Sequence, residues 1–165
     1  MLRKLYLVPV LAMFLVPAIA QAQFEEGDWT LQLAGQGAND QNFDEGSASV
    51  QFDLGYFLTK ELNIGVREGL VWADGGSAWG LSSFAYIDYH FDMDHWQPFI
   101  GWNIGKACGD AVANDDDWFT GPEAGVKYFV NTTTFIQGTV QYEFNLEEGF
   151  DEGAFQYLLG IGFKW

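Results

Sequence analysis

The sequence FQYLLGIGFKW, residues Phe155–Trp165, alternates between two kinds of side chain. Every odd-numbered position is large and apolar or aromatic, whereas the even-numbered positions hold Gln, Gly, Lys and one Leu. A period of two is typical of a β-strand with one apolar face and one polar face. Such a strand would promote aggregation at the edge of a soluble sheet. It suits the closing strand of a barrel whose apolar face meets lipid, with Trp165 among the aromatic residues at the membrane boundary.

Seven earlier segments show the same alternation, and each has about the nine to eleven residues that cross a bilayer as a tilted strand. They are Gly27–Gly37, Ala48–Leu58, Leu62–Trp72, Leu81–Phe91, Pro98–Lys106, Phe119–Val130 and Thr134–Phe144. The connections after the second, fourth and sixth segments are short, whereas the others are longer and rich in Gly or Asp. These patterns predict an all-β fold, an eight-stranded antiparallel up-and-down transmembrane β-barrel with both termini on one side. The alternative architecture is a soluble lipocalin-like barrel, in which the apolar faces point inward.

Glu68 interrupts the pattern, because it falls on the apolar face of the strand expected at Leu62–Trp72. A β-bulge re-aims the side chains of a strand and is one way to accommodate such a residue. We therefore expect a bulge or a different register at Glu68.

The first 22 residues have the features of a secretory signal peptide. Arg3 and Lys4 are basic, an apolar run follows from Leu5 to Val16, and small residues around Ala20 and Ala22 form cleavage sites of the A-x-A type. The apolar run is shorter than the about 20 residues of a spanning helix. We expect cleavage after Ala22, with Ala20 as the alternative. Residues 1–22 are then a cleaved signal peptide and residues 23–165 are one outer-membrane β-barrel domain.

The charge of the expected domain excludes some partners. Two of the seven basic residues lie in the signal peptide and all 23 acidic residues lie beyond it, so the domain has a net charge of −18. Such a chain does not bind nucleic acid by charge. The single cysteine, Cys108, cannot form a disulfide within the chain.

The C-terminal stretch resembles the assembly signal of bacterial outer-membrane β-barrels at Gly160, Phe163 and Trp165. Other segments resemble those of the small eight-stranded outer-membrane family that includes OmpX and the barrel of OmpA. These segments are Gly55–Leu58, Trp96–Gly101 and Gly125–Val130. The resemblance implies export through the periplasm, a place in the bacterial outer membrane, and the barrel-assembly machinery as a partner during biogenesis. It implies an architecture more than a function.

Eight ionisable residues fall on the face that the alternation turns inward. They are Asp53, Arg67, Asp88, His90, Glu123, Lys127, Glu143 and Lys164. The interior of an eight-stranded barrel is just wide enough for side chains to fill it, and buried charges are costly unless they are paired. We expect a structural charge network inside the barrel. The alternative is a narrow path for protons or ions.

Asp88 and His90 also raise a catalytic alternative. A histidine base needs a nucleophile within hydrogen-bond reach, and Ser82 and Ser83 lie too far from His90 along an extended strand. The sequence contains no compact zinc motif. We expect no enzymatic activity, no catalytic residue, no cofactor and no metal site.

The longer connections are acidic and contain Asp40, Asp44, Glu45, Asp74, Asp110, Asp115, Asp116, Asp117, Glu147, Glu148, Asp151 and Glu152. We expect solvated loops. The alternative is weak binding of Ca²⁺ or Mg²⁺, hard cations that prefer oxygen ligands and that would bridge the loops to lipopolysaccharide phosphates or to a partner.

These observations together predict a structural or interaction role at the cell envelope. We expect a monomer in contact with outer-membrane lipid and lipopolysaccharide. The alternative function is a narrow channel for ions or small solutes, and a second alternative is a lipid A-modifying enzyme of the outer membrane.

Overall fold

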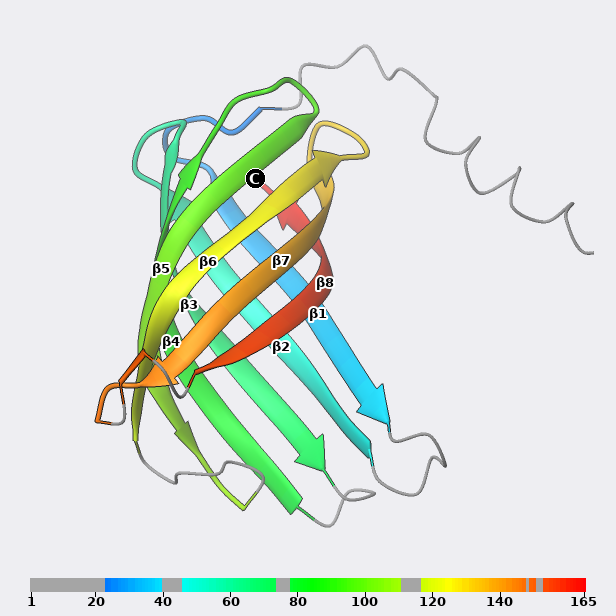
Figure 1. The fold of residues 1–165 in the computed structure, drawn as a ribbon. Coiled ribbons are helices and arrows are strands. Elements are labelled where there is room, and N and C mark those ends of the chain that lie inside the picture. Colours follow the sequence, from blue (N-terminus) through cyan, green and yellow to red (C-terminus); the bar gives the residue numbers. More distant parts are fainter. Residues whose placement is uncertain (1–22, 40–45, 74–77, 111–116, 148, 151–152) are drawn as a thin grey trace, which may run out of the picture.

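Eight antiparallel strands form one closed barrel in the computed structural model, which describes residues 23–39, 46–73, 78–110, 117–147, 149–150 and 153–165 (Figure 1). The strands are β1 (Trp29–Asn39), β2 (Gly46–Phe57), β3 (Leu62–Ala73), β4 (Ala78–His90), β5 (Trp96–Cys108), β6 (Trp118–Phe129), β7 (Thr134–Asn145) and β8 (Ala154–Lys164). Each strand pairs with the next in sequence, and β8 also pairs with β1. The predicted eight-stranded up-and-down barrel is confirmed. The expected signal peptide, residues 1–22, lies outside the described residues. Within the described residues, no helix has the length and apolar character needed to cross a membrane.

The two ends of the barrel differ in their connections. The C-terminus lies at the end that we call the terminal end, and the opposite end is the loop end (Figure 1). Gln23 is also at the terminal end, because its carbonyl oxygen is hydrogen-bonded to Lys164. The terminal end carries the short turns 58–61, 91–95 and 130–133. Three of the connections at the loop end are longer, but the one between β3 and β4 spans only residues 74–77. This hairpin extends further than predicted, and Trp72 lies opposite Trp79 in it as a cross-strand aromatic pair.

The apolar faces of the strands point away from the barrel axis. In β1, Leu31 and Leu33 are each 45% exposed, whereas Thr30, Gln32 and Ala34 between and beside them are buried. The other strands show the same orientation, and their outward side chains include Phe52, Val66, Ile87, Ile100, Val140 and Leu159. A lipocalin-like barrel would turn these side chains inward, so that alternative architecture is wrong.

Hydrogen bonds between the first and last strands close the barrel. Residues 30–35 of β1 pair with residues 159–164 of β8, and Trp29 and Trp165 exchange two backbone hydrogen bonds of 3.0 and 3.1 Å. A Cβ atom on Gly160 would lie 2.8 Å from the Leu33 carbonyl oxygen, so only glycine fits this close approach. Phe163 and Trp165 point outward. The role of these positions as an assembly signal stays a prediction.

The expectation of a bulge or a different register at Glu68 is wrong. The pairing of β3 with β2 and with β4 runs without interruption through this residue, which lies opposite Phe52 and Ser83. The Glu68 side chain points outward and is exposed. Ser83 Oγ donates a 2.6 Å hydrogen bond to Glu68 Oε1. A hydroxyl partner on the next strand, rather than a distorted backbone, accommodates the carboxyl group.

Candidate functional site in the barrel interior

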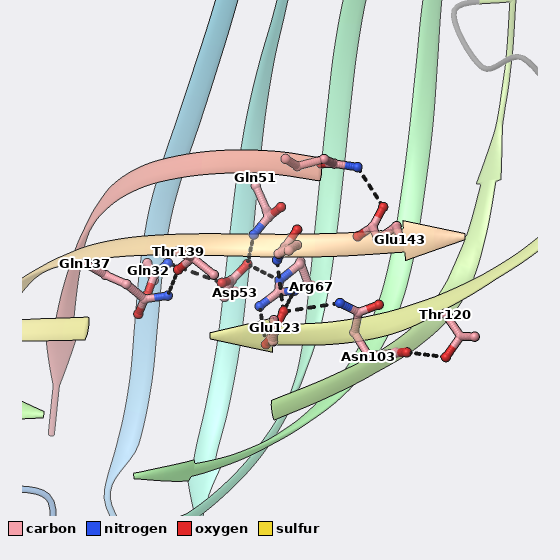
Figure 2. Close-up of polar contacts among 12 residues, drawn as sticks. Gln32, Gln51, Asp53, Arg67, Asn103, Thr120, Glu123, Gln137, Thr139 and Glu143 are labelled. Carbon is pink, nitrogen blue, oxygen red and sulfur yellow. Dashed lines mark hydrogen bonds and ion pairs between the residues drawn. The ribbon is translucent and has the colours of Figure 1, made fainter. Parts of the chain in front are cut away.

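Arg67 lies at the centre of the barrel interior and binds two carboxylates (Figure 2). Its Nη1 and Nη2 atoms donate hydrogen bonds of 2.7 and 3.2 Å to the two oxygens of Glu123, and its Nε atom donates one of 3.3 Å to Asp53. All three side chains are buried. Paired hydrogen bonds from one guanidinium to one carboxylate fix both groups in direction as well as in distance. The arrangement joins β2 and β3 to β6 through the interior.

Side-chain amides donate further hydrogen bonds to these two carboxylates. Gln32 and Gln51 donate hydrogen bonds to Asp53, and Asn103 and Gln141 donate to Glu123. The donor–acceptor distances lie between 3.0 and 3.3 Å. The Tyr86 ring lies 4.9 Å from Arg67 Cζ, in position for a cation–π contact. The Arg67 cluster, defined as Arg67 with these seven partners, therefore takes side chains from all strands from β1 to β7.

Aromatic rings fill the interior between the Arg67 cluster and the terminal end. This aromatic layer comprises Phe24, Phe57, Phe99, Phe129 and Phe135, all of which are buried. The Nζ atom of Lys127 lies 5.2 to 6.0 Å from the centres of four of these rings, within the range of cation–π attraction. The Nε2 atom of His90 lies 3.5 Å from the same ammonium group, and its ring packs against three rings of the layer.

Phe24 enters this layer from a segment that precedes the first strand. Its ring stacks on Phe57 with 4.1 Å between ring centres. Lys164 Nζ donates hydrogen bonds of 2.6 Å to the Gln23 carbonyl oxygen and 2.7 Å to Asp28 Oδ2. The Gly27 backbone N–H donates to the Phe57 carbonyl oxygen at 2.9 Å. These bonds hold residues 23–28 across the terminal end, so that Phe24 covers the interior there.

Three of the ionisable residues predicted for the interior are not yet placed. Glu143 accepts a 2.7 Å hydrogen bond from Gln156 on β8. Lys164 binds the N-terminal segment described above. Asp88 is 2% exposed and interacts with Glu123 and Lys127, although its Oδ1 atom has no hydrogen-bond partner among the described residues. Of the eight residues, three thus belong to the Arg67 cluster, two contact the aromatic layer, and Asp88 interacts with members of both groups. A single structural network of all eight stays a prediction.

Sequence reasoning missed the amides of the Arg67 cluster and the aromatic layer. The amides alternate inward with the charged residues, so the same period of two contains their signal. Phe57, Phe129 and Phe135 are the inward residues closest to a short turn in their strands, and Phe99 follows Gln97 on the inward face of β5. Phe24 precedes the first alternating segment. Its position as the second residue after the expected cleavage site is the only sign of its role in the sequence.

The described residues give His90 no nucleophile to activate. Its side chain is 1% exposed and is enclosed by aromatic rings and Lys127. Ser83, one of the two serines considered for catalysis, is hydrogen-bonded to Glu68 on the outer wall instead. In the described part of the chain, no three His, Cys, Asp or Glu residues are grouped so that they could hold a metal ion.

Most of the acidic connecting residues lie outside the described residues, and Asp110, Asp117 and Glu147 are those that are described. Asn145 Nδ2 donates a 2.7 Å hydrogen bond to Asp117. Cation binding by these loops stays a prediction.

Comparison with known proteins supports the fold. No family model matches the sequence, and no curated protein is similar to it. The N-terminal β-barrel domain of Pseudomonas aeruginosa OprF is similar in structure with a TM-score of 0.66 and 18% identity, over 85% of this chain and 98% of that one. The outer membrane protein OprG of the same organism has a TM-score of 0.62 and 14% identity, over 88% and 99%. Neisserial surface protein A has a TM-score of 0.59 and 18% identity, over 84% and 96%. The chain thus has the fold of the small eight-stranded outer-membrane barrels.

Proposed function

We propose that the protein is a bacterial outer-membrane β-barrel with a structural or interaction role at the cell envelope. The observation that carries this proposal is the outward orientation of the large apolar side chains around a closed barrel. Soluble monomers rarely expose so large an apolar surface. The same surface is stable in a membrane, because the apolar band meets hydrocarbon and the closed barrel has no unpaired strand edge.

The filled interior supports a structural role over conduction. The Arg67 cluster links strands on different sides of the interior, and the aromatic layer with Phe24 covers the terminal end. Eight-stranded barrels have room for side chains but little more. At the other end, we propose that the acidic loops contact lipopolysaccharide or a partner, with Ca²⁺ or Mg²⁺ as the bridging ion.

Planar-bilayer recording with purified protein tests this role. We expect no steady unitary conductance above that of a protein-free bilayer. A matched control is an established porin prepared and inserted in the same way. Reproducible unitary steps that scale with the amount of protein would favour a channel and would contradict the structural role.

One observation favours a narrow ion path as the second candidate. Between the Arg67 cluster and the aromatic layer, buried polar atoms of Asn63, Asp88 and His90 have no hydrogen-bond partner among the described residues. Asn63 and Asp88 are directly opposite each other on β3 and β4, and His90 follows on the inward face of β4. If the protein is such an ion path, these three residues form a polar column that conducts only when the N-terminal segment, residues 23–28, leaves the terminal end.

A further inference from the structure

Glu68, Ser83 and Lys106 form a polar row on the outer wall of the barrel, on the neighbouring strands β3, β4 and β5. Ser83 lies opposite Glu68 on one side and opposite Lys106 on the other. Among the described residues, Ser83 is the only hydrogen-bond donor to the Glu68 carboxyl, at 2.6 Å. Lys106 Nζ lies 5.4 Å from the ring centre of Trp118, an outward side chain that is half-exposed. The row thus presents a carboxyl, a hydroxyl and an ammonium group in order.

The polar row interrupts an otherwise apolar surface. Val66, Leu81 and Ile104 are its outward neighbours on the three strands, and all three are exposed. A charged side chain on the lipid face of a barrel is destabilising, and an ionisable residue within a membrane points to a functional site. Packing or strand pairing does not require a carboxyl group at position 68, since the neighbouring outward positions are apolar. A ligand with complementary polar groups would account for the row.

The depth of the row restricts the ligand. A rise of about 3.3 Å per residue and a tilt of about 40° advance a strand by about 2.5 Å per residue along the barrel axis. Measured from the first residue of β3, Glu68 lies about 15 Å from the terminal end. Each step to the paired residue on the next strand, about 4.8 Å across, adds about 3 Å at this tilt, so Lys106 lies about 6 Å nearer to the loop end than Glu68. The apolar band of such a barrel is about 25 Å tall. Lys106, at about 21 Å, is therefore close to the outer boundary of the band, with Trp118 beside it, and Glu68 lies deeper inside the band.

We propose that the polar row binds lipid A of the outer leaflet. The ammonium group of Lys106 contacts a phosphate at the membrane boundary. Ser83 and Glu68 lie deeper and accept hydrogen bonds from the amide N–H and hydroxyl groups of the amide-linked 3-hydroxyacyl chains. Glycerophospholipids fit less well, because the groups below their phosphate are ester carbonyls, which cannot donate to a carboxylate. This proposal rests on the outer-membrane location proposed above.

The test uses the protein in phospholipid nanodiscs with and without lipid A, and it measures lipid A retained in native mass spectrometry. We expect the wild type to retain lipid A. Glu68→Leu and Lys106→Met should each weaken binding about tenfold, the effect of losing a hydrogen bond to a charged group. Lys60→Met is the matched control, because it removes the same charge from a turn at the terminal end, where Lys60 pairs with Glu61. Its retention of lipid A should equal that of the wild type.

Glu68→Leu also separates this proposal from a purely structural role of Glu68. In nanodiscs without lipid A, it should be at least as resistant to urea as the wild type, because it removes a carboxyl group from the lipid face. Glu68→Gln is the second variant, for use if Glu68→Leu does not fold.

Three results would overturn the proposal. The first is equal lipid A retention by the wild type and by the variants of the polar row. The second is a wild-type dimer, without lipid A, that Glu68→Leu converts to monomers, since the row would then bind a second copy of the chain. The third is a wild type that does not insert into nanodiscs at all, and that result would also reject the proposed location.

Discussion

Arg67 is the only cation that the structure places within hydrogen-bond distance of Asp53 and Glu123 among the described residues. Arg67→Ala would remove the cation that is hydrogen-bonded to both of these buried carboxylates. Removing one partner of a buried ion pair costs about 3–5 kcal/mol. We expect a loss of this size in the free energy of unfolding, measured by urea titration of the refolded protein with tryptophan fluorescence. Lys60→Ala is the control, because Lys60 is exposed and such pairs contribute less than about 1 kcal/mol. Equal effects of the two substitutions would contradict a structural role for the Arg67 cluster.

A combined substitution tests whether uncompensated charge is the cause of that loss. Replacing Arg67 by Met together with Asp53→Asn and Glu123→Gln removes all three charges and nearly preserves the shape of the side chains. Neutral replacement of a buried ion pair is often close to neutral for stability. We therefore expect the triple variant to be more resistant to urea than Arg67→Ala in the same titration. If the triple variant were the less stable of the two, the hydrogen-bond geometry rather than the charge would hold the barrel together.

The inward position of these residues was predictable, but their partners were only partly so. Asp53 and Arg67 lie directly opposite each other on β2 and β3, and the short turn between these strands fixes their register. Glu123 is on β6, and its approach to Arg67 depends on how the closed barrel staggers its strands. No local pattern contains that information. The separate position of Lys164 has a similar cause, because its partners belong to the segment before β1.

The N-terminal segment, residues 23–28, acts as an element of its own although it contains no strand. Phe24 is 3% exposed and contacts Phe57, Phe129, Phe135 and His90. Phe24→Ala should lower the free energy of unfolding by about 3–5 kcal/mol, as large-to-small substitutions in a core do. Urea titration measures this, with Phe91→Ala as the control, because Phe91 points outward at the same end of the barrel.

Phe24→Ala also decides between the two candidate functions. The Arg67 cluster still fills the interior in this variant, so planar-bilayer recording should show no unitary conductance. Conductance that appears in Phe24→Ala and is absent in the wild type and in Phe91→Ala would instead support the polar column of Asn63, Asp88 and His90 as an ion path closed by the N-terminal segment.

The lengths of the strands were less predictable than their number. Alternation gave the eight strands, but β4 and β5 begin or end several residues beyond the predicted ranges. Ala78 and Cys108 lie where Gly and acidic residues dominate the composition, and composition alone favours a loop there. The register of the neighbouring strands continues the pairing beyond the apolar residues. Glu68 shows the same limit, because one hydroxyl on β4 replaced the bulge that its own strand predicted.

At the scale of the whole molecule, the decisive property is the direction of the apolar faces, and a single charge on that surface tests it. Val66 is near the middle of β3 and 50% exposed. In lipid vesicles, Val66→Lys should lower the free energy of unfolding by about 2–4 kcal/mol, the cost of a lysine facing the middle of a bilayer. Leu146→Lys, in the connection after β7, is the control and should have an effect near zero, because Leu146 is equally exposed but lies at the loop end.

The same pair of variants also distinguishes membrane from water as the surroundings of the barrel. In water, both lysines would be solvated, and both variants would be as stable as the wild type. Because every strand turns its apolar residues in the same direction, a stable Val66→Lys variant in vesicles would contradict the location proposed for the whole barrel, and the lipid A site on its wall with it.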